Sequence, residues 1–454
     1  MQGSPRQSVG SRTQSDTATT RPISCVDPES RLEQSIARSG PTRQTRLTDS
    51  PVDRATRKRG QLAQAILTNA RGARTNLSHP LTRCITDPSS SLLTNMSVAP
   101  AFIDMRSDTV TKPTAAMRSA MANADVGDDV FGDDPTVLEL QRQCATLLGK
   151  EAGLFVPSGT MGNLISLLVH VDARGGEMIL GDQSHIHFYE QGNSAQFGGI
   201  HSRTVRNQPD GTLDLAEIER AIRPPNTPDD HLPQTQLICI ENTQNRMGGR
   251  VLSVEYMDAL GALAKKHGVK LHVDGARLLN ASVALCVPPA ALVASADSVS
   301  LCLSKGLAAP VGSVIVGTTD FIRRAKRLRK ALGGGMRQVG ILAAAGLLAI
   351  NVMAKGLAAD HAHAKQLAKA FQSVKGIIVP PIENVETNIL YIELDGAVLS
   401  CTAAQLVAAV KAQGLLVTAT DVMKIRFVTH YMIDDAAIAR SIELVTKAVE
   451  SFRK

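Results

Sequence analysis

The sequence predicts an α/β fold: a large domain with a mostly parallel β-sheet covered by helices, followed by a smaller C-terminal α+β domain. Two observations predict it. From Phe102 onwards, short apolar segments of strand length alternate with longer segments of helical periodicity. The short segments lack the polar alternation of half-exposed strands, which is typical of strands buried on both faces of a parallel sheet. Beyond about residue 355, helices alternate with fewer and shorter strands.

The individual elements follow from these patterns. In the large domain we predict helices at 163–171 and 257–267 and six strands, at 153–157, 177–181, 236–240, 269–273, 298–303 and 311–316. In the small domain we predict helices at 357–373, 403–413 and 434–451 and strands near 377, at 388–393 and at 424–429. We place the large domain at residues 99–350 and the small domain at residues 351–454.

The N-terminal segment 1–98 differs in composition from the rest of the chain. It is rich in Ser, Thr, Arg and Gln, and we expect it to be a disordered basic extension. It holds 14 of the 49 Lys and Arg residues and 7 of the 42 Asp and Glu residues, so the whole net charge of +7 lies there. The extension is either a transit peptide or the result of a start codon placed too far upstream, with Met96 or Met105 as the true beginning.

These features also bear on partners and compartment. The neutral main body gives no reason to expect nucleic acid as a partner. The longest apolar stretch, 339–354, has 16 residues and is too short for a confident membrane span, so we expect a buried helix and no membrane contact. The seven cysteines are widely spaced without a CxxC pair, which argues against a disulfide framework or a zinc site. We expect a cytoplasmic protein, or a mitochondrial one if residues 1–98 are a transit peptide.

Two charged runs have simple structural interpretations. Residues 323–330 carry six cations in eight positions, for which we expect a solvated helix face or a subunit contact. Residues 125–134 carry five Asp residues, for which we expect a polar loop and a helix cap. The acidic run lacks the spacing of a metal-binding loop, so we predict no metal site there.

Three predicted strands end in polar groups, and ligands of open parallel sheets bind at the carboxyl ends of the strands. After the strand 153–157 comes a turn, Ser158-Gly159-Thr160, that leads into a helix. Glycine at Gly159 allows close approach of the backbone, and the start of the helix offers free N–H groups to a phosphate. An ordinary strand–helix turn is the alternative.

Asp274 stands at the end of the second of these strands, where a carboxylate is costly to bury unless it is paired. A protonated pyridine nitrogen is one such partner, and it would keep a pyridine ring cationic and electron-accepting. A turn cap, or an ion pair with Arg277, is the alternative. Lys305 follows the third strand, 31 residues after Asp274. A partly desolvated lysine can form a Schiff base, although most lysines at strand ends lie at the surface.

The order of phosphate turn, Asp and Lys belongs to a known pattern. From about Asp104 to the end, some 350 residues resemble the low-specificity threonine aldolases, which are fold-type I, aspartate-aminotransferase-like enzymes that use pyridoxal 5'-phosphate (PLP). The matching stretches are 105–113 (MRSDTVTKP), 126–132 (VGDDVFG), 157–163 (PSGTMGN), His185, Tyr189-Glu190, 241–243 (ENT), 272–277 (HVDGAR), 303–306 (LSKG), 333–338 (GGGMRQ) and 426–430 (RFVTH).

The resemblance implies roles for the matching positions. It implies that Lys305 is the Schiff-base lysine and that Asp274 is the partner of the pyridine nitrogen. His185 corresponds to the histidine stacked on the pyridine ring, which is also a candidate base for the substrate hydroxyl. The remaining implied positions are Gly159 and Thr160 at the phosphate, Arg277 beside the ring oxygen and the substrate, Arg337 at the phosphate of a neighbouring subunit, and Ser107 and Arg426 at the substrate carboxylate.

One position departs from the family pattern. Many members have Glu-Asn-Thr-His-Asn where this chain has Gln244 in place of the histidine, which is thought to contact the substrate hydroxyl. Gln244 can hydrogen-bond a hydroxyl but cannot act as a base near neutral pH. The departure leaves open which diastereomer of the substrate is preferred.

The resemblance therefore implies PLP-dependent cleavage of L-threonine or L-allo-threonine, a small-molecule amino-acid substrate, to glycine and acetaldehyde, by a homotetramer with shared active sites. The nearest alternative is another PLP reaction on the same fold, such as transamination or β-elimination, which would give a keto acid. A PLP-binding or phosphate-binding protein without catalysis and a nucleic-acid-binding function of residues 1–98 are alternatives from other classes.

Overall fold

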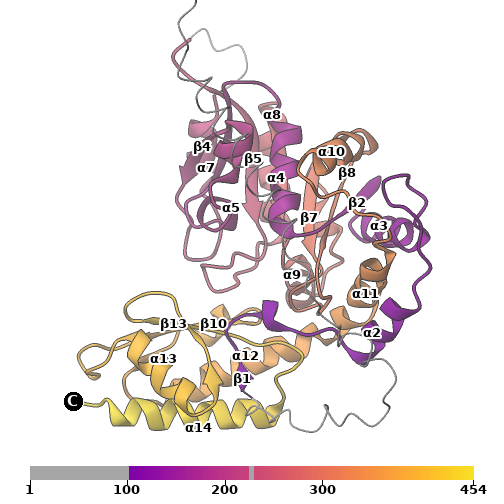
Figure 1. Cartoon of the computed structure of the whole chain (residues 1–454). Helices are drawn as coiled ribbons and strands as arrows, with labels where there is room; N and C mark the ends of the chain where they lie inside the picture. Colours follow the sequence, from indigo (N-terminus) through magenta and orange to yellow (C-terminus); the bar gives the residue numbers. More distant parts are fainter. Residues whose placement is uncertain (1–101, 224–229) are drawn as a thin grey trace, which may run out of the picture. The chain divides into compact units, whose positions relative to one another are not determined.

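The computed structural model describes residues 102–223 and 230–454. The predicted basic extension, residues 1–98, lies outside the described residues. Within them the chain forms a seven-stranded sheet with helices on both faces and a second, smaller sheet with its own helices (Figure 1).

The large sheet has the strand order β2-β8-β7-β6-β5-β3-β4. All neighbouring pairs are parallel except the two pairs that β8 makes, with β2 and with β7. This confirms the predicted mostly parallel sheet. The strands are β2 (Ala152–Val156), β3 (Gly176–Gly181), β4 (His201–Val205), β5 (Gln234–Glu241), β6 (Lys270–Asp274), β7 (Ser298–Cys302) and β8 (Ser313–Gly317).

Alternate residues of these strands pack into different hydrophobic clusters, which shows that helices cover both faces. In β5, Leu237 and Cys239 pack against α4 (Gly159–His170), whereas Ile238 and Ile240 join the main core. The six predicted strands are confirmed with ends shifted by one or two residues. The sequence pattern missed β4 because it is an edge strand with mostly polar, partly exposed residues.

The helices of this domain begin at conventional caps. Ser158 caps α4, Asp134 caps α3 and Ser253 caps α8, each by accepting a main-chain N–H of the first turn. The remaining helices are α2 (Ala115–Ala122), α3 (Pro135–Leu147), α5 (His185–Phe188), α6 (Asn193–Gly198), α7 (Leu215–Ala221), α8 (Val254–Lys266), α9 (Leu278–Leu285), α10 (Thr319–Ala331) and α11 (Gly340–Asn351).

The second core is formed mainly by the C-terminal part of the chain. Its sheet has the order β12-β13-β10-β9 and is antiparallel throughout. The elements are α12 (Leu357–Phe371), β9 (Ile377–Ile378), β10 (Ile389–Leu394), α13 (Ala403–Ala412), β11 (Leu415–Leu416), β12 (Thr418–Ala419), β13 (Lys424–Val428) and α14 (Asp435–Ser451). The division into domains at residue 350 stays a prediction.

The first residues that the structure describes pack in the second core, although the predicted range of the large domain, 99–350, includes them. Strand β1 (Ile103–Asp104) pairs in parallel with β11, and Met105 is fully buried in the second core. Figure 1 shows this indigo segment beside the orange and yellow elements of the C-terminal part. Residues 103–105 thus contact the second core, and the predicted domain boundaries stay a prediction.

The apolar stretch 339–354 is part of a longer helical region. Within the described ranges, Gly340–Phe371 is the one helical stretch long and apolar enough to cross a membrane. It consists of α11, a short 3-10 turn and α12, and Ala343, Ala345 and Ala349 of α11 are buried in the main core. The prediction of a buried helix therefore holds for these residues.

The two charged runs pair with one another. Asp134 caps α3, as predicted for the acidic run. Asp129 binds Arg329 of α10 at 2.5 Å, and Asp128 binds Arg337 at 2.8 Å. Arg329 is 2% exposed and also donates to the carbonyl of Phe155, so the expectation that the whole run 323–330 lies on a solvated face is wrong for this residue.

Candidate active site

A cavity of about 440 Å³ lies at the carboxyl ends of β5, β6 and β7. The last residue of β5, Glu241, and the last residue of β6, Asp274, line it, and Lys305 follows three residues after β7. The complete lining is Ser107, Thr109, His185, Tyr189, Glu241, Asn245, Asp274, Ala276, Arg277, Lys305, Thr418, Ala419, Thr420 and Arg426. Six of the predicted site residues are therefore brought together: Lys305, Asp274, His185, Arg277, Ser107 and Arg426.

Lys305 is half-buried in a turn that other parts of the chain hold in place. Its carbonyl accepts a hydrogen bond from Thr111 Oγ1 at 2.8 Å and another from the main chain of Ala308. Its ammonium group lies close enough to Asp108 to contribute to that carboxylate's low pKa. The lysine thus projects from a fixed backbone into a site that contains several acidic groups.

Asp274 is 3% exposed and retains acceptor capacity towards the cavity. Its Oδ1 accepts the main-chain N–H of Ala276 at 3.1 Å, and its Oδ2 accepts Asn163 Nδ2 at 3.0 Å. A carboxylate can accept about four hydrogen bonds, so a further donor is accommodated. A protonated pyridine nitrogen satisfies that requirement, which favours the predicted role over a simple turn cap.

His185 begins α5 beside these groups. Its Nδ1 binds Glu190 Oε1 at 2.9 Å, and its ring lies 5.4 Å from that of Tyr189. Burial lowers the pKa of the imidazole, but the hydrogen bond to Glu190 and the charges of Asp274 and Glu190 outweigh it, so the pKa lies above its ordinary value. One potential ligand atom from each of His185, Glu190 and Asp274 lies within 4.8 Å of the other two, a spacing that metal ligands can have. Because Asn163 donates to both carboxylates, hydrogen bonds explain this arrangement.

Glu241 supports the same corner of the cavity. Its two oxygens accept the main-chain N–H groups of His185 at 2.9 Å and Asn245 at 3.0 Å. Burial and the negative charge of Asp274 raise the pKa of Glu241 to about 7. Glu241 therefore holds the main chains of His185 and Asn245 relative to one another. Because its pKa is near 7, its charge can change near neutral pH.

Arg277 is buried, and its guanidinium group is already paired. Its Nε and Nη2 donate to the two oxygens of Asp108 at 2.7 and 2.6 Å. Burial would raise the pKa of Asp108, but Arg277, Lys305 and a hydrogen bond from Asn388 hold it well below its ordinary value. Arg277 lines the cavity as expected, but its planar fork binds Asp108 and not a free acceptor. The predicted position of Arg277 beside the cofactor and the substrate stays a prediction.

Arg426 and Ser107 lie on another side of the cavity. Arg426 donates to the carbonyl of Arg106 at 3.0 Å and to Asn245 Oδ1 at 3.3 Å, and it lies close enough to Tyr391 to act on the pKa of that phenol. Its buried Nε has no partner among the described residues. Ser107 caps a short 3-10 helix, Asp108–Val110, and accepts the N–H of Thr109. An anion such as a carboxylate would satisfy the remaining donor capacity of Arg426.

The phosphate turn fits the group predicted for it. Gly159 starts α4, and a Cβ placed there would lie 2.6 Å from Cys302 Sγ, so only glycine fits. The serine cap takes the N–H of Met161 with its hydroxyl and that of Gly162 with its carbonyl, which leaves the first N–H groups of the helix available. Gly159 and Thr160 are not among the cavity-lining residues, so the predicted contact to phosphate stays a prediction.

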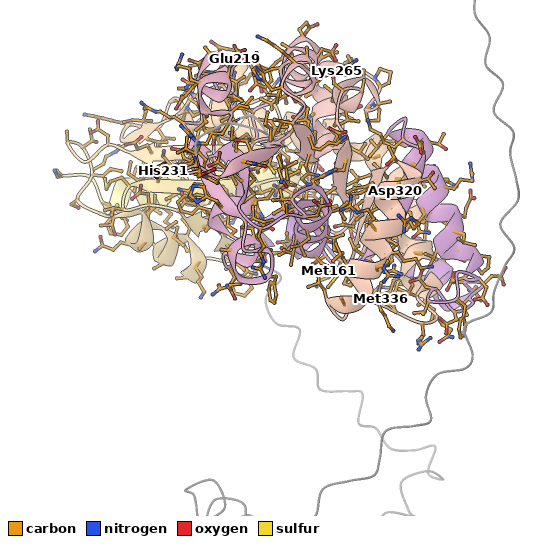
Figure 2. The ribbon with its side chains drawn as sticks, turned by 90° about the horizontal axis from the view of Figure 1, so that it is seen from above. Met161, Glu219, His231, Lys265, Asp320 and Met336 are labelled. Carbon is orange, nitrogen blue, oxygen red and sulfur yellow. The ribbon has the colours of Figure 1, made fainter. Side chains whose placement is uncertain are left out.

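Two predicted residues lie away from the cavity. Arg337 is 56% exposed at its side chain and pairs with Asp128. Its segment lies beside the start of α4, because a Cβ at Gly334 would overlap Met161, and Figure 2 shows Met161 and Met336 near each other.

Gln244 is 1% exposed and does not line the cavity. Its amide donates to Gln183 O at 3.0 Å and accepts from Met247 N at 2.8 Å, and its predicted contact with the substrate stays a prediction.

Several site residues were missed because their partners are distant in sequence. Asp108 belongs to the matching stretch 105–113. Its partner, Arg277, lies 169 residues further along the chain. Glu190 and Glu241 also stood in quoted motifs without an assigned role. The density of polar residues within these motifs was a signal that could have singled them out.

A second cavity, of about 500 Å³, lies nearby and is lined by residues that include Arg246, Tyr391 and Lys424. It lacks the strand-end lysine and aspartate of the first cavity. We therefore place the chemistry in the first cavity.

Comparison with known proteins identifies the family. Residues 104–395 match the beta-eliminating lyase family. Over 341 residues the chain is 54% identical to a probable low-specificity L-threonine aldolase from Arabidopsis thaliana, which covers 74% of this chain and 94% of that protein.

Solved structures give the same fold. A threonine aldolase from Leishmania major superposes with a TM-score of 0.63 at 20% identity, over 76% of this chain and 99% of that one. An aspartate aminotransferase from Rhodobacter sphaeroides gives a TM-score of 0.59 at 18% identity, over 79% and 95% of the two chains. The predicted aspartate-aminotransferase-like, fold-type I architecture is confirmed. The chain therefore belongs to the beta-eliminating lyase family and, within it, to the low-specificity threonine aldolases.

Proposed function

We propose that this protein is a PLP-dependent aldolase that cleaves L-threonine and L-allo-threonine to glycine and acetaldehyde. The observation that carries the proposal is the convergence of Lys305, Asp274, His185 and Arg426 on one cavity at the carboxyl ends of the strands. The identity of 54% to a protein named as a probable low-specificity L-threonine aldolase supports the substrate class.

The residues present fit PLP. Lys305 would bind it covalently, and Asp274 would face the pyridine nitrogen with its remaining acceptor capacity. The glycine at 159, where a side chain would strike Cys302, would leave room for the phosphate at the start of α4. When bound, PLP supplies a cationic ring that accepts the electron pair of the breaking Cα–Cβ bond.

The protein side chains orient the substrate and move its protons. Arg426, with Ser107, would hold the carboxylate, because the planar guanidinium fork matches a carboxylate. His185, or a water molecule that it orients, would take the proton of the β-hydroxyl group. Its bond to Glu190 fixes the ring, and the raised pKa makes it a stronger base than free histidine. The departure of acetaldehyde would follow removal of that proton, and delivery of a proton to Cα would give glycine.

One spectrum and one assay test the proposal. We expect the purified full-length chain to bind PLP with absorbance near the visible edge and to release acetaldehyde from both threonine diastereomers. Lys305→Ala should abolish both the absorbance band and the release of aldehyde. Lys326→Ala, on α10 outside the cavity, is the matched control and should change neither.

The products separate the alternatives. Glycine and aldehyde in equal amounts support aldol cleavage, whereas a keto acid indicates transamination or β-elimination. A colourless wild-type protein, or one that releases no aldehyde from either isomer, contradicts the proposal.

We further propose a homotetramer in which Arg337 of one subunit reaches the phosphate bound by its neighbour. The support is that Arg337 is exposed and lies outside its own cavity, and that Phe131 and Phe197 are 80% and 64% exposed. The test mixes inactive Lys305→Ala and Arg337→Ala subunits. Shared sites predict recovered activity in the hybrids, because some sites then contain both intact residues, whereas separate sites predict none.

A further inference from the structure

A chain of buried polar side chains leads from Asp274 into the protein interior. Asn163 Nδ2 donates to Asp274 Oδ2 at 3.0 Å, and Asn163 Oδ1 lies 3.1 Å from His272 Nε2. His272 Nδ1 lies 2.8 Å from Ser298 Oγ, which lies 2.7 Å from His170 Nε2. Asn163, His272 and Ser298 are at most 2% exposed. The mechanism described above uses none of these four side chains.

Helix and strand periodicity create this line of contacts. Asn163 and His170 are seven residues apart on α4 and so share one helix face. On β6, His272 and Asp274 point to the α4 side of the sheet, since the alternate residues Leu271 and Val273 join the main core. Ser298 is the register partner of His272 on the neighbouring strand β7. The polar groups therefore meet where α4 crosses β6 and β7.

The hydrogen bonds of this chain have a fixed direction. The Asn163 amide faces two carboxylates, Asp274 and Glu190, at 3.0 and 2.9 Å, so its NH₂ group must lie towards them. Its oxygen then faces His272, and His272 must donate from Nε2. His272 Nδ1 is left as an acceptor for the Ser298 hydroxyl, whose oxygen accepts the Nε2–H of His170. Every hydrogen bond in the chain therefore donates towards Asp274.

This direction requires the His272 imidazole to be neutral, whereas His170 can donate from Nε2 in either charge state, and the surroundings of both rings favour the neutral form. Burial, partly offset by Asp274, lowers the pKa of His272 to about 4. Burial and the neighbouring His272 lower the pKa of His170 to about 3. The chain is not a proton path, because the amide of Asn163 cannot readily pass a proton on. Its effect on Asp274 is to orient the carboxylate and to stabilise its charge.

We propose that His272 is a positioning residue of the cofactor site, which holds the Asp274 carboxylate, through Asn163, in the orientation that a pyridine nitrogen requires. Ser298 and His170 fix the tautomer of His272 that makes this possible. The inference rests on the proposed function, because it takes PLP as the group that Asp274 faces. The titratable groups near Asp274 are His185, Glu190, Cys239, Glu241, His272 and Lys305.

Two substitutions of His272 distinguish a positioning role of its Nε2–H group from a role that only fills space in the core. Glutamine at 272 places its amide nitrogen near the position of Nε2 and keeps the donor to Asn163. Asparagine places its amide near the position of Nδ1 and loses that donor. We expect His272→Gln to bind PLP within about three-fold of wild type, and His272→Asn to bind it about ten-fold more weakly, as expected for one lost buried hydrogen bond.

The spectrum and kinetics give further readouts. With His272→Asn, the pH at which the visible band of the bound cofactor changes should shift, and kcat for L-threonine should fall while KM changes little. His272→Gln should retain the wild-type pH profile. Ser298→Ala removes the donor to Nδ1 and the acceptor for His170, and we expect an effect of about two- to five-fold on PLP binding.

The controls are His267→Asn, which changes a histidine that binds Glu219, and thermal unfolding of every variant. Equal effects of His272→Gln and His272→Asn on PLP binding and on the spectrum overturn the proposal, as does a loss of binding that only follows a loss of thermal stability. Wild-type spectra in both 272 variants also overturn it while leaving the proposed function intact. A wild-type protein that shows no visible band with PLP overturns the proposed function and this inference with it.

Discussion

The two sides of the cavity differ in how far the protein completes their hydrogen bonds. The cofactor wall, defined here as Asp274, Asn163, His272, Ser298 and His170, is bonded internally from one side chain to the next. The substrate wall, defined as Ser107, Asn245 and Arg426, lies closer to solvent, and Arg426 Nε has no partner in the described part of the chain.

This difference indicates which groups the molecule fixes in advance. The cofactor wall needs little reorganisation to receive a ring, because the side chains behind Asp274 are already paired and aligned and only the cavity side of Asp274 keeps acceptor capacity. The substrate wall offers unused donor capacity, which a substrate carboxylate would satisfy. Substitutions should therefore act on the cofactor spectrum on one side and on substrate affinity on the other.

The largest effect is expected at Asp108, which joins Arg277 of the cavity to Asn388 of the second core. Asp108→Ala leaves the buried Arg277 cation without its partner, so we expect the free energy of unfolding to fall by about 3–5 kcal/mol. Urea unfolding measures this change. Asp104→Ala, which breaks an exposed pair with Arg106, is the control and should cost at most about 1 kcal/mol. Equal losses in the two variants would contradict the assignment.

Substitution of Arg426 tests the role of the substrate wall in binding the substrate carboxylate. Arg426→Ala should lower kcat/KM for L-threonine by about 10- to 100-fold, since a charge-assisted hydrogen bond contributes about 1.5–3 kcal/mol. The visible band of bound PLP should remain, because Arg426 is not part of the cofactor wall. Arg440→Ala, on the exposed side of α14, is the control. A lost band in Arg426→Ala would show that the two walls are not separate.

A pH experiment on Glu241 sharpens the comparison, since this residue supports His185 on one side and Asn245 on the other. Burial and Asp274 raise the pKa of Glu241 from 4.5 to about 7. The folded state then holds this proton more tightly than the unfolded state, so its contribution to stability is present below about pH 4.5 and is lost as pH rises through 7.

Glu241→Gln removes this titration. Relative to wild type, its free energy of unfolding should rise by on the order of 1–3 kcal/mol between about pH 5 and pH 8. Denaturant unfolding at both pH values measures the difference. A difference between variant and wild type that does not change with pH would show that Glu241 titrates normally.

The smallest effect on catalysis is expected at Gln244. Gln244→His restores the family residue, but the side chain is buried and its amide bonds Gln183, Glu241 and Met247. We expect the ratio of kcat/KM values for L-threonine and L-allo-threonine to change by less than about three-fold, with a loss of stability of about 1 kcal/mol. A change of ten-fold or more would place this side chain at the substrate after all.

The strands and the residues at their ends could be predicted from the sequence because they depend on local pattern. The apolar runs before Lys305 and Asp274 placed both at one edge of the sheet, as found. Roles that depend on distant partners could not be predicted in this way. The family resemblance implied the positions of Arg277 and Gln244, and the local sequence does not reveal their partners. Asp108 lies 169 residues from Arg277, and the bonds of the Gln244 amide are set by the folded loop.

The pairing of β1 with β11 has a consequence for how the chain is made. Ile103 pairs with Leu415, so the start of the fold must wait for more than three hundred residues to be synthesised before it finds its partner. The large sheet has all its strands by Gly317 and can form earlier on the ribosome. The segment from Ile103 to Met105 can join the second core only once β11 has been made, so the Ser107–Arg426 side of the cavity is completed after the large sheet.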